Sequence, residues 1–160
     1  MLLGNAERRV IEMAHVVILG NEAYALLNFR GALIRSIAAS GHHVTVMAAP
    51  ASNEQIQQLE DLGAQFHSYP LQRNGLNPLK DLQTFIALRK AFHELKPDVL
   101  IACFIKPVVF GGLALKKISN VSFFAVITGL GYVFYGQSMF RKILRIIVSK
   151  LYQISSMGVT

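Results

Sequence analysis

Residues 69–82 read Tyr-Pro-Leu-Gln-Arg-Asn-Gly-Leu-Asn-Pro-Leu-Lys-Asp-Leu and join a predicted strand to a predicted helix. The stretch contains an Asn-Gly turn and an Asn-Pro pair of the kind that starts a helix. A connection between a strand and a helix needs only a few polar residues. This one also carries a cation, Arg73, at its centre, and the turn residues fix where that side chain points. We therefore expect a loop with a function beyond connection.

Strands and helices alternate on both sides of this stretch. Short apolar runs predict strands at His15–Leu19, His43–Ala49, Gln65–Tyr69, Val99–Phe104 and Ser122–Ile127. Predicted helices occupy approximately residues 25–40, 53–62, 78–96, 107–118 and 138–154. This order predicts an α/β fold with an open, doubly wound, mostly parallel sheet of the Rossmann-like type. Its crossovers should be right-handed.

The ends of the predicted helices carry residues that suit those positions. Ser52 is a good N-cap, and Pro78 fits the first position of a helix. Gly41 fits the C-terminal end of the first helix. That first helix is predicted from apolar residues at helical spacing, namely Leu26, Phe29, Leu33 and Ile37.

The composition indicates one folded domain with a positive charge. The chain has 160 residues, of which 52% are hydrophobic and 16% are charged, and this mix excludes a disordered tail. The net charge of +7 points to nucleic acid, an anionic membrane surface or a phosphorylated substrate. The longest apolar candidate for a membrane span, residues 139–154, is interrupted by Arg141, Lys142, Arg145 and Lys150, so we expect no transmembrane helix.

The two ends of the chain and its cysteine give further expectations. Residues 1–12 are out of place before the first strand, so we expect an extension of doubtful status there and a domain over 13–160, starting at Met1 or Met13. They also lack the apolar core of a secretory signal. Cys103 is the single cysteine, which excludes an intrachain disulfide and fits a reducing compartment.

Several kinds of site are disfavoured. Gly20 is followed by Asn21-Glu22 and lacks the spacing of a dinucleotide-binding loop. The five histidines show no metal-ligand spacing, and there is no nucleophile-elbow pattern for Ser/His/Asp catalysis. The basic residues are spread along the chain without a recognised nucleic-acid module. We therefore expect no metal, no bound cofactor and no nucleic acid.

Ligands of such sheets bind at the carboxyl ends of the strands. The predicted loops there are 20–24, 50–52, 72–77, 105–107 and 128–132. Arg73 has a planar guanidinium that suits a diphosphate, although a loop arginine can also be merely exposed. Lys106 would stand beside the free N–H groups of a helix start, where an anion is favoured, or it could extend to solvent. Gly129-Leu130-Gly131-Tyr132 is either a plain turn or a close approach to a ligand with Tyr132 as a platform.

Three segments in order resemble the first domain of family 4 glycosyltransferases that act on polyprenyl-diphosphate sugars. They are residues 69–82, Leu27-Asn28-Phe29-Arg30-Gly31, and Ile105-Lys106-Pro107 with residues 128–134. The resemblance implies the N-terminal half of a GT-B fold. It implies acceptor or phosphate binding by Arg73, Lys106, Arg30 and Asn77, and cleft loops that contain Gly20, Asn21, Tyr24, Gly129, Gly131 and Tyr132. Many relatives carry a histidine near the end of the fourth strand, where this chain has Ala102-Cys103-Phe104-Ile105.

The resemblance also implies a function for the chain. Such a domain binds a polyprenyl-diphosphate-linked sugar, and a C-terminal domain or partner subunit holds the nucleotide-sugar donor. The chain stops near where that donor domain should begin, so we expect a fragment or a subunit that is inactive alone. The resemblance implies hexosyl transfer in cell-surface polysaccharide synthesis, with retained anomeric configuration and no metal. The place would be the cytoplasmic face of the inner membrane.

The last predicted helix leaves a competing interpretation open. Its apolar residues share one side, and Arg141, Lys142 and Arg145 lie on the other. Such a helix either packs on the core or lies on an anionic membrane surface. The alternative function is a non-catalytic, membrane-associated subunit or interaction module.

Overall fold

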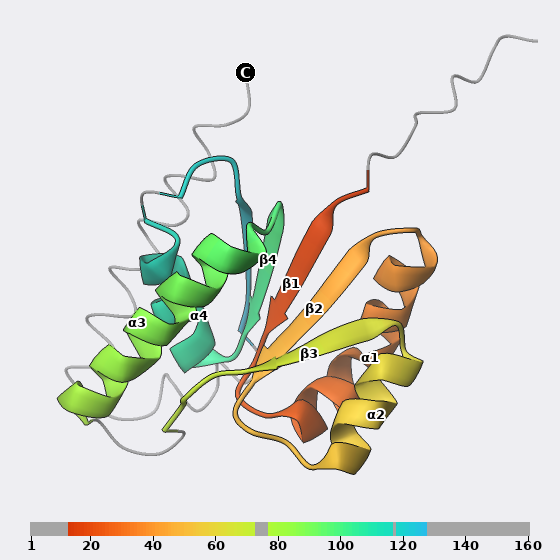
Figure 1. Ribbon diagram of the computed structural model, residues 1–160, viewed down its shortest axis with the longest axis horizontal. Helices are drawn as coiled ribbons and strands as arrows, with labels where there is room; N and C mark the ends of the chain where they lie inside the picture. Colours follow the sequence, from red (N-terminus) through yellow and green to blue (C-terminus); the bar gives the residue numbers. More distant parts are fainter. Residues whose placement is uncertain (1–12, 73–76, 117, 128–160) are drawn as a thin grey trace, which may run out of the picture.

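The computed structural model describes residues 13–72, 77–116 and 118–127. A five-stranded sheet forms its centre, with strand order β3-β2-β1-β4-β5 (Figure 1). The strands are β1 His15–Leu19, β2 His43–Ala48, β3 Ala64–Ser68, β4 Val99–Cys103 and β5 Ser122–Val126. Every neighbouring pair is parallel. The predicted doubly wound α/β fold is therefore confirmed.

Two helices cover each face of the sheet. The helices are α1 Ala23–Ala39, α2 Asn53–Asp61, α3 Pro78–Leu95 and α4 Ile105–Ala114. Helices α1 and α2 pack together on one face, and α3 and α4 pack together on the other (Figure 1). The predicted helix over residues 138–154 lies outside the described residues. Among the helices of the described ranges, none combines the length and the apolar character that crossing a bilayer requires.

The central strand β1 shows why its sequence is apolar throughout. Val17 and Leu19 lie in the core under α3 and α4, with Leu88 and Phe92. Val16 and Ile18 lie in the core under α1 and α2. Because successive side chains of a strand point to opposite faces, a sheet covered on both sides needs a continuous apolar run.

Local residues set the helix ends as expected. Ser52 and Gln55 form a reciprocal capping box at the start of α2. Asn77 caps α3, whose first residue is Pro78. Gly41 follows α1 with φ of 87°, a left-handed conformation that a glycine adopts without strain. The observed strand bounds agree with the predicted ones to within one residue at each end.

Helix α4 differs from the prediction at both ends. It begins at Ile105, two residues before the predicted start at Pro107. The N–H groups in the first turn of a helix have no intrahelical acceptor. Proline, which lacks an N–H, therefore fits the third helical position as well as the first. The helix ends at Ala114 rather than near Ile118, and the N–H groups of Lys116 and Ile118 then donate to carbonyls three residues earlier, those of Leu113 and Leu115. Leu115 and Ile118 remain packed in the core, so the apolar pattern could not mark this end.

The apolar face of α1 agrees only in part with the one that the spacing suggested. Phe29 is 69% exposed and Leu33 is 39% exposed. Of the predicted apolar residues, Leu26 is buried and Ile37 packs against the core, and the other buried residues of the helix are Ala23 and Ile34. Because α1 contacts α2 as well as the sheet, its buried stripe is rotated away from Phe29. The hydrophobic pattern identified the helix but not its orientation.

Candidate functional site

The rule for doubly wound sheets leads us to expect a ligand-binding crevice at the carboxyl ends of β1 and β4. The chain passes from β1 to β2 and β3 in one direction and then returns to lay β4 on the other side of β1. These two central strands are in register, with Leu19 opposite Ala102. In sheets of this kind, ligands bind where the strand order reverses. Apart from Arg30, which lies within α1, the predicted site residues that the structure describes lie on loops and helix starts at this end of the sheet.

The loop after β1 is held by three hydrogen bonds. The Gly20 N–H donates to Met47 O at 2.8 Å, and the Ala49 N–H donates to Asn21 O at 3.2 Å. The buried Tyr69 hydroxyl donates to Gly20 O at 2.8 Å. Burial raises the pKa of Tyr69, so the phenol keeps its proton. Sequence reasoning treated Tyr69 only as the end of a strand and missed its part in ordering this loop.

Gly20 has a packing reason as well as a loop position. A Cβ at this residue would lie 2.7 Å from the side chain of Leu26, which is fully buried. The loop therefore passes too close to α1 for any side chain at residue 20. This packing requirement is sufficient to explain the glycine. Its role in letting a phosphate approach the backbone remains a prediction.

Two buried side-chain amide oxygens in the loops after β1 and β3 accept no hydrogen bond from the described residues. They are Asn21 Oδ1, after β1, and Gln72 Oε1, after β3. Buried polar atoms are usually paired. A hydroxyl-bearing ligand would supply donors to them. Tyr24, in the first turn of α1, is 63% exposed.

Lys106 joins three segments at the start of α4. Its Nζ donates to Gln72 O at 2.7 Å and lies 3.3 Å from Asp81 Oδ1. The Lys106 and Asp81 side chains are only 13% and 17% exposed. The ammonium is thus balanced by a carboxylate from the first turn of α3, and it ties the loop after β3 to both helices. Sequence reasoning identified Lys106 but missed Asp81.

Asn77 acts at the start of α3. Its Oδ1 accepts hydrogen bonds from the N–H groups of Leu79 and Lys80 at 3.2 and 3.3 Å. These bonds satisfy two N–H groups that a helix start leaves unpaired. The predicted contact between Asn77 and an acceptor stays a prediction, since the cap already engages the side-chain oxygen.

Arg30 reaches the end of β4 from α1. Its Nη1 donates to Phe29 O at 2.9 Å. Its guanidinium also lies near the thiol of Cys103, a buried residue 73 positions later in the chain. Burial raises the pKa of the Cys103 thiol, and the nearby Arg30 acts in the opposite direction. The thiol is therefore a neutral, enclosed neighbour of Arg30.

Phe104 connects β4 to α4 in an unusual backbone conformation. Its φ is 75° and its ψ is 161°, a region that residues other than glycine rarely occupy. The Phe104 N–H donates to Val126 O at 3.1 Å, which holds the turn against β5. Such strain is found disproportionately at binding and catalytic sites. It fixes the direction in which α4 and Lys106 leave the sheet.

Four predicted site residues lie outside the described residues: Arg73, Gly129, Gly131 and Tyr132. Of the others, the structure places Arg30 and Lys106 at the carboxyl end of β4, and Gly20 and Asn21 at that of β1. No group of three or more metal-ligating side chains occurs among the described residues.

Comparisons with known proteins agree with this arrangement. Residues 15–157 match the protein family described as Glycosyl transferase 4-like. CalG4, described as the calicheamicin glycosyltransferase, is similar with a TM-score of 0.55 and 15% identity, over 93% of this chain and 44% of CalG4. MurG of Acinetobacter baumannii is similar with a TM-score of 0.51 and 20% identity, over 70% of this chain and 34% of MurG.

The same fold also occurs in another class of enzyme. A deacetylase of teicoplanin biosynthesis is similar with a TM-score of 0.55 and 16% identity, over 78% of this chain and 71% of that protein. At these identities the likeness shows the fold alone. A search of curated proteins finds no match. The chain spans less than half the length of CalG4 and of MurG.

Proposed function

This chain belongs to the glycosyl transferase 4-like family, and we propose that it is the acceptor-binding half of a glycosyltransferase. The acceptor would be a sugar on a polyprenyl diphosphate, and the donor a nucleotide-sugar held by a second domain or a partner subunit. The reaction would be hexosyl transfer in polysaccharide synthesis, at the cytoplasmic face of a membrane.

The observation that carries this proposal is the placement of two cations at the end of β4. Arg30 comes from α1 and Lys106 from α4, and these helices cover opposite faces of the sheet. A diphosphate in the crevice would meet a cation from either side. Guanidinium groups bind such oxygens through two parallel hydrogen bonds. Arg73, from the segment between β3 and α3, would add a third cation.

Unpaired acceptors beside these cations suit the sugar part of the ligand. Asn21 Oδ1 and Gln72 Oε1 are buried and take no hydrogen bond from the described residues. Sugar hydroxyls would donate to them while the cations hold the diphosphate. The domain would then supply orientation, which removes an entropic part of the barrier, and the donor domain would stabilise the leaving nucleotide diphosphate.

The test of this function is sugar transfer with and without a donor domain. We expect the 160-residue chain alone to transfer no sugar, because a transition state held between two domains is not assembled by one. Addition of a donor-domain polypeptide from the same family should restore transfer to a short-chain prenyl-diphosphate sugar. Transfer by the chain alone would contradict the proposal, because it would require a complete site within these residues.

A second candidate function is a non-catalytic, membrane-associated module. The observation that favours it is the net charge of +7, together with the basic amphipathic segment at residues 139–154. Under this alternative the chain would bind anionic vesicles, and a donor domain would not produce transfer. The transfer assay therefore separates the two functions.

A further inference from the structure

The side chains of β4 alternate between the two faces of the sheet until the strand ends. Leu100 and Ala102 lie in the core under α3 and α4. Ile101 and Cys103 lie on the other face, under α1 and α2. Because successive side chains of a strand point to opposite faces, Phe104 should return to the face of α3 and α4. It packs instead on the same face as Cys103.

The backbone of Phe104 explains this break in the alternation. Its φ of 75° and ψ of 161° lie in a region that is almost restricted to glycine. Its N–H donates to Val126 O at 3.1 Å, and its carbonyl accepts from the Val108 N–H at 3.1 Å, so the turn is held on both sides. A glycine would make this turn without strain. The chain therefore keeps a strained conformation whose consequence is the position of one aromatic ring.

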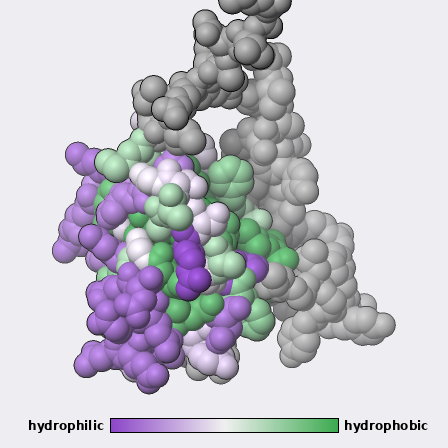
Figure 2. Space-filling view, turned by 90° about the vertical axis from the view of Figure 1, so that its right-hand side faces the viewer, coloured by the Kyte–Doolittle hydropathy of each residue, from purple (hydrophilic) through white to green (hydrophobic). Residues whose placement is uncertain are grey.

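The ring lies where the cover of α1 and α2 is incomplete. Phe104 is only partly buried, and so are Ile101 and Val126 on the same face. Phe124, two residues before Val126 in the edge strand β5, is 56% exposed. Seen from the side of α1 and α2, hydrophobic side chains reach the surface among hydrophilic ones (Figure 2). Apolar surface at this end of β4 is thus open to a ligand.

An unpaired hydrogen-bond acceptor lies at the same level of the sheet. Leu19 of β1 is paired in register with Ala102 of β4. Asn21 and Phe104 each come two residues after this pair, so both leave the carboxyl ends of adjacent strands together. Asn21 Oδ1 is buried and accepts no hydrogen bond from the described residues. Such an oxygen needs a donor from a ligand or from water.

An aromatic ring beside a hydroxyl acceptor suits a pyranose. The C–H groups on one face of the sugar pack against the electron-rich face of an aromatic ring, and its hydroxyls donate to amide oxygens. Arg30 lies near Cys103, which shares its face of the sheet with Phe104, so a cation for a diphosphate is on the same side. A prenyl chain would use the ring but would leave Asn21 Oδ1 unpaired. The sugar therefore matches more of what the structure offers.

We propose that Phe104 determines specificity for the first sugar of the acceptor by packing its ring against the pyranose. Asn21 accepts a hydrogen bond from one hydroxyl of the same sugar. The strained backbone keeps the ring on the side of Arg30, so the sugar and its diphosphate are bound on one face of the sheet. This inference rests on the proposed function and deepens it, because it assigns recognition of the sugar to two residues.

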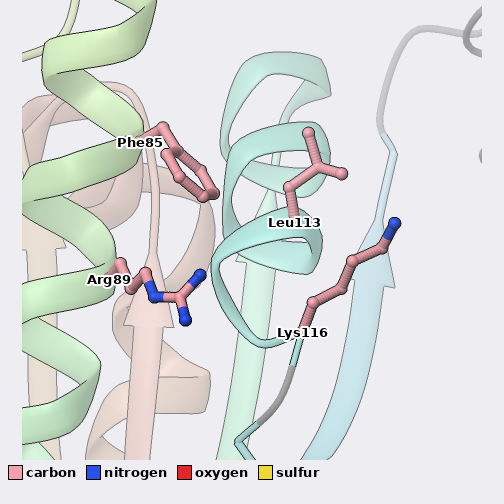
Figure 3. A pocket seen from close by; sticks show the side chains of 4 residues that line it. All are labelled: Phe85, Arg89, Leu113 and Lys116. Carbon is pink, nitrogen blue, oxygen red and sulfur yellow. The ribbon is translucent and has the colours of Figure 1, made fainter.

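A cleft on the other face of the sheet supplies a matched control. Phe85 and Arg89 extend from α3 toward α4, whose Leu113 lines the cleft together with the following Lys116 (Figure 3). The volume is about 390 Å³. This cleft also combines an aromatic ring with basic side chains, but neither of the two unpaired buried oxygens belongs to it. Replacement of Phe85 therefore removes a partly buried ring without touching the proposed sugar site.

The placement of the ring has a test that needs no ligand. Phe104→Gly and Phe104→Ala both remove the side chain, but only glycine relieves the backbone strain. Alanine is normally the more stable of the two residues within an element. At residue 104 we expect the opposite order, with Phe104→Gly unfolding at the higher urea concentration. The ordinary order would overturn the inference, because the ring would then not be held by a strained turn.

Calorimetric titration of the full chain with two soluble ligands tests the specificity. One is a short-chain prenyl-diphosphate sugar, and the other is the same prenyl diphosphate without the sugar. Phe104→Leu should weaken binding of the first by about 2- to 12-fold, the range expected for loss of an aromatic contact, and leave the second unchanged. Asn21→Ala should also weaken only the first. Phe104→Tyr should keep both affinities, and so should the control Phe85→Leu.

The ratio of the two affinities separates recognition from a structural role. If Phe104→Leu weakened both ligands equally, or neither, or if Phe85→Leu had the same effect, the inference would be overturned while the proposed function stood. If the wild-type chain bound neither ligand, the proposed function would fail and this inference with it. Circular dichroism and urea denaturation of each variant check that the fold is retained.

Discussion

Lys106 holds together segments that are distant in the sequence, through contacts with Gln72 O and Asp81. A hydrogen bond to a charged group in such a place contributes about 1.5–3 kcal/mol. The ion pair between Lys90 and Glu94 has the same chemistry, but its side chains are 77% and 58% exposed. Exposed pairs contribute little, because water screens the charges and the side chains lose freedom.

Replacement of Lys106 should therefore affect stability more than replacement of Lys90. We expect Lys106→Met to lower the free energy of unfolding by about 1.5–3 kcal/mol, because Asp81 and Gln72 O lose their donor. Lys90→Met should change it by less than about 0.5 kcal/mol. Urea denaturation of both variants measures the difference. Equal effects would show that Lys106 is not a structural tie.

Gly20 gives a second prediction at the scale of one residue. Gly20→Ala should lower the free energy of unfolding by about 1–3 kcal/mol, because the new methyl group would press on the buried Leu26. The control is Gly112→Ala in α4, where a Cβ would lie 3.5 Å from Phe123. An alanine inside a helix is favourable by about 0.5–1 kcal/mol, so this variant should not be destabilised. If Gly20→Ala left the free energy of unfolding unchanged, packing against Leu26 would not explain the glycine, and a role in ligand approach would.

At the scale of one element, α3 depends on its first turn. Asn77 caps this helix with two hydrogen bonds. Asn77→Ala should cost about 1 kcal/mol of stability, whereas Asn77→Ser should cost little because serine is also a good cap. Thermal unfolding measures both. If both variants keep full stability but lose acceptor binding, Asn77 contacts the ligand and the cap is dispensable.

At the amino-terminal ends of the strands, the side chain of His15 in β1 contacts β2 and α3. Leu95 O can only accept, so His15 Nδ1 donates to it at 2.8 Å. His15 Nε2 then accepts from the Thr45 hydroxyl, also at 2.8 Å, which requires a neutral ring. Burial is the main cause that lowers the pKa of His15 below its ordinary value of 6.5, and the nearby His43 adds to this. The carbonyl of Leu95 and the charge of Asp98 act in the opposite direction.

This network gives the fold a pH dependence with a definite sign. The unfolded chain binds a proton at His15 more readily than the folded chain, so stability falls as the pH drops below 6.5. Urea denaturation across this range should show the decrease, and His15→Gln should reduce it. The control His93→Gln changes an exposed histidine of α3 and should leave the slope as it is. A slope unaffected by His15→Gln would contradict the network.

The sequence predicted elements better than it predicted faces and partners. Short apolar runs and capping residues such as Ser52 and Pro78 are local, so strand bounds and helix starts followed from them. The exposed position of Phe29 depends on how α1 meets α2, which no local pattern records. The same holds for the site. Lys106 was identified from its place after a strand, but its partner Asp81 is 25 residues away and is known only from the fold.

At the scale of the whole molecule, the strand order determines where the site lies. Since β4 returns to the other side of β1, the ends of these strands meet residues from α1 and from α4. Arg30 and Lys106 reach this point from opposite faces, and the proposed acceptor diphosphate would lie between them. The account therefore depends most on whether this crevice binds a prenyl-diphosphate sugar.

Isothermal titration of the full chain with a short-chain prenyl-diphosphate sugar measures this directly. We predict saturable binding that Arg30→Ala and Arg73→Ala each weaken by about 10- to 150-fold, the loss of one charge-assisted contact. Arg35→Ala, on the same helix as Arg30, should leave the affinity unchanged, because this residue lies on another side of α1. No binding, or equal affinities for the wild-type chain, Arg30→Ala and Arg73→Ala, would contradict the assignment of this crevice as the acceptor site.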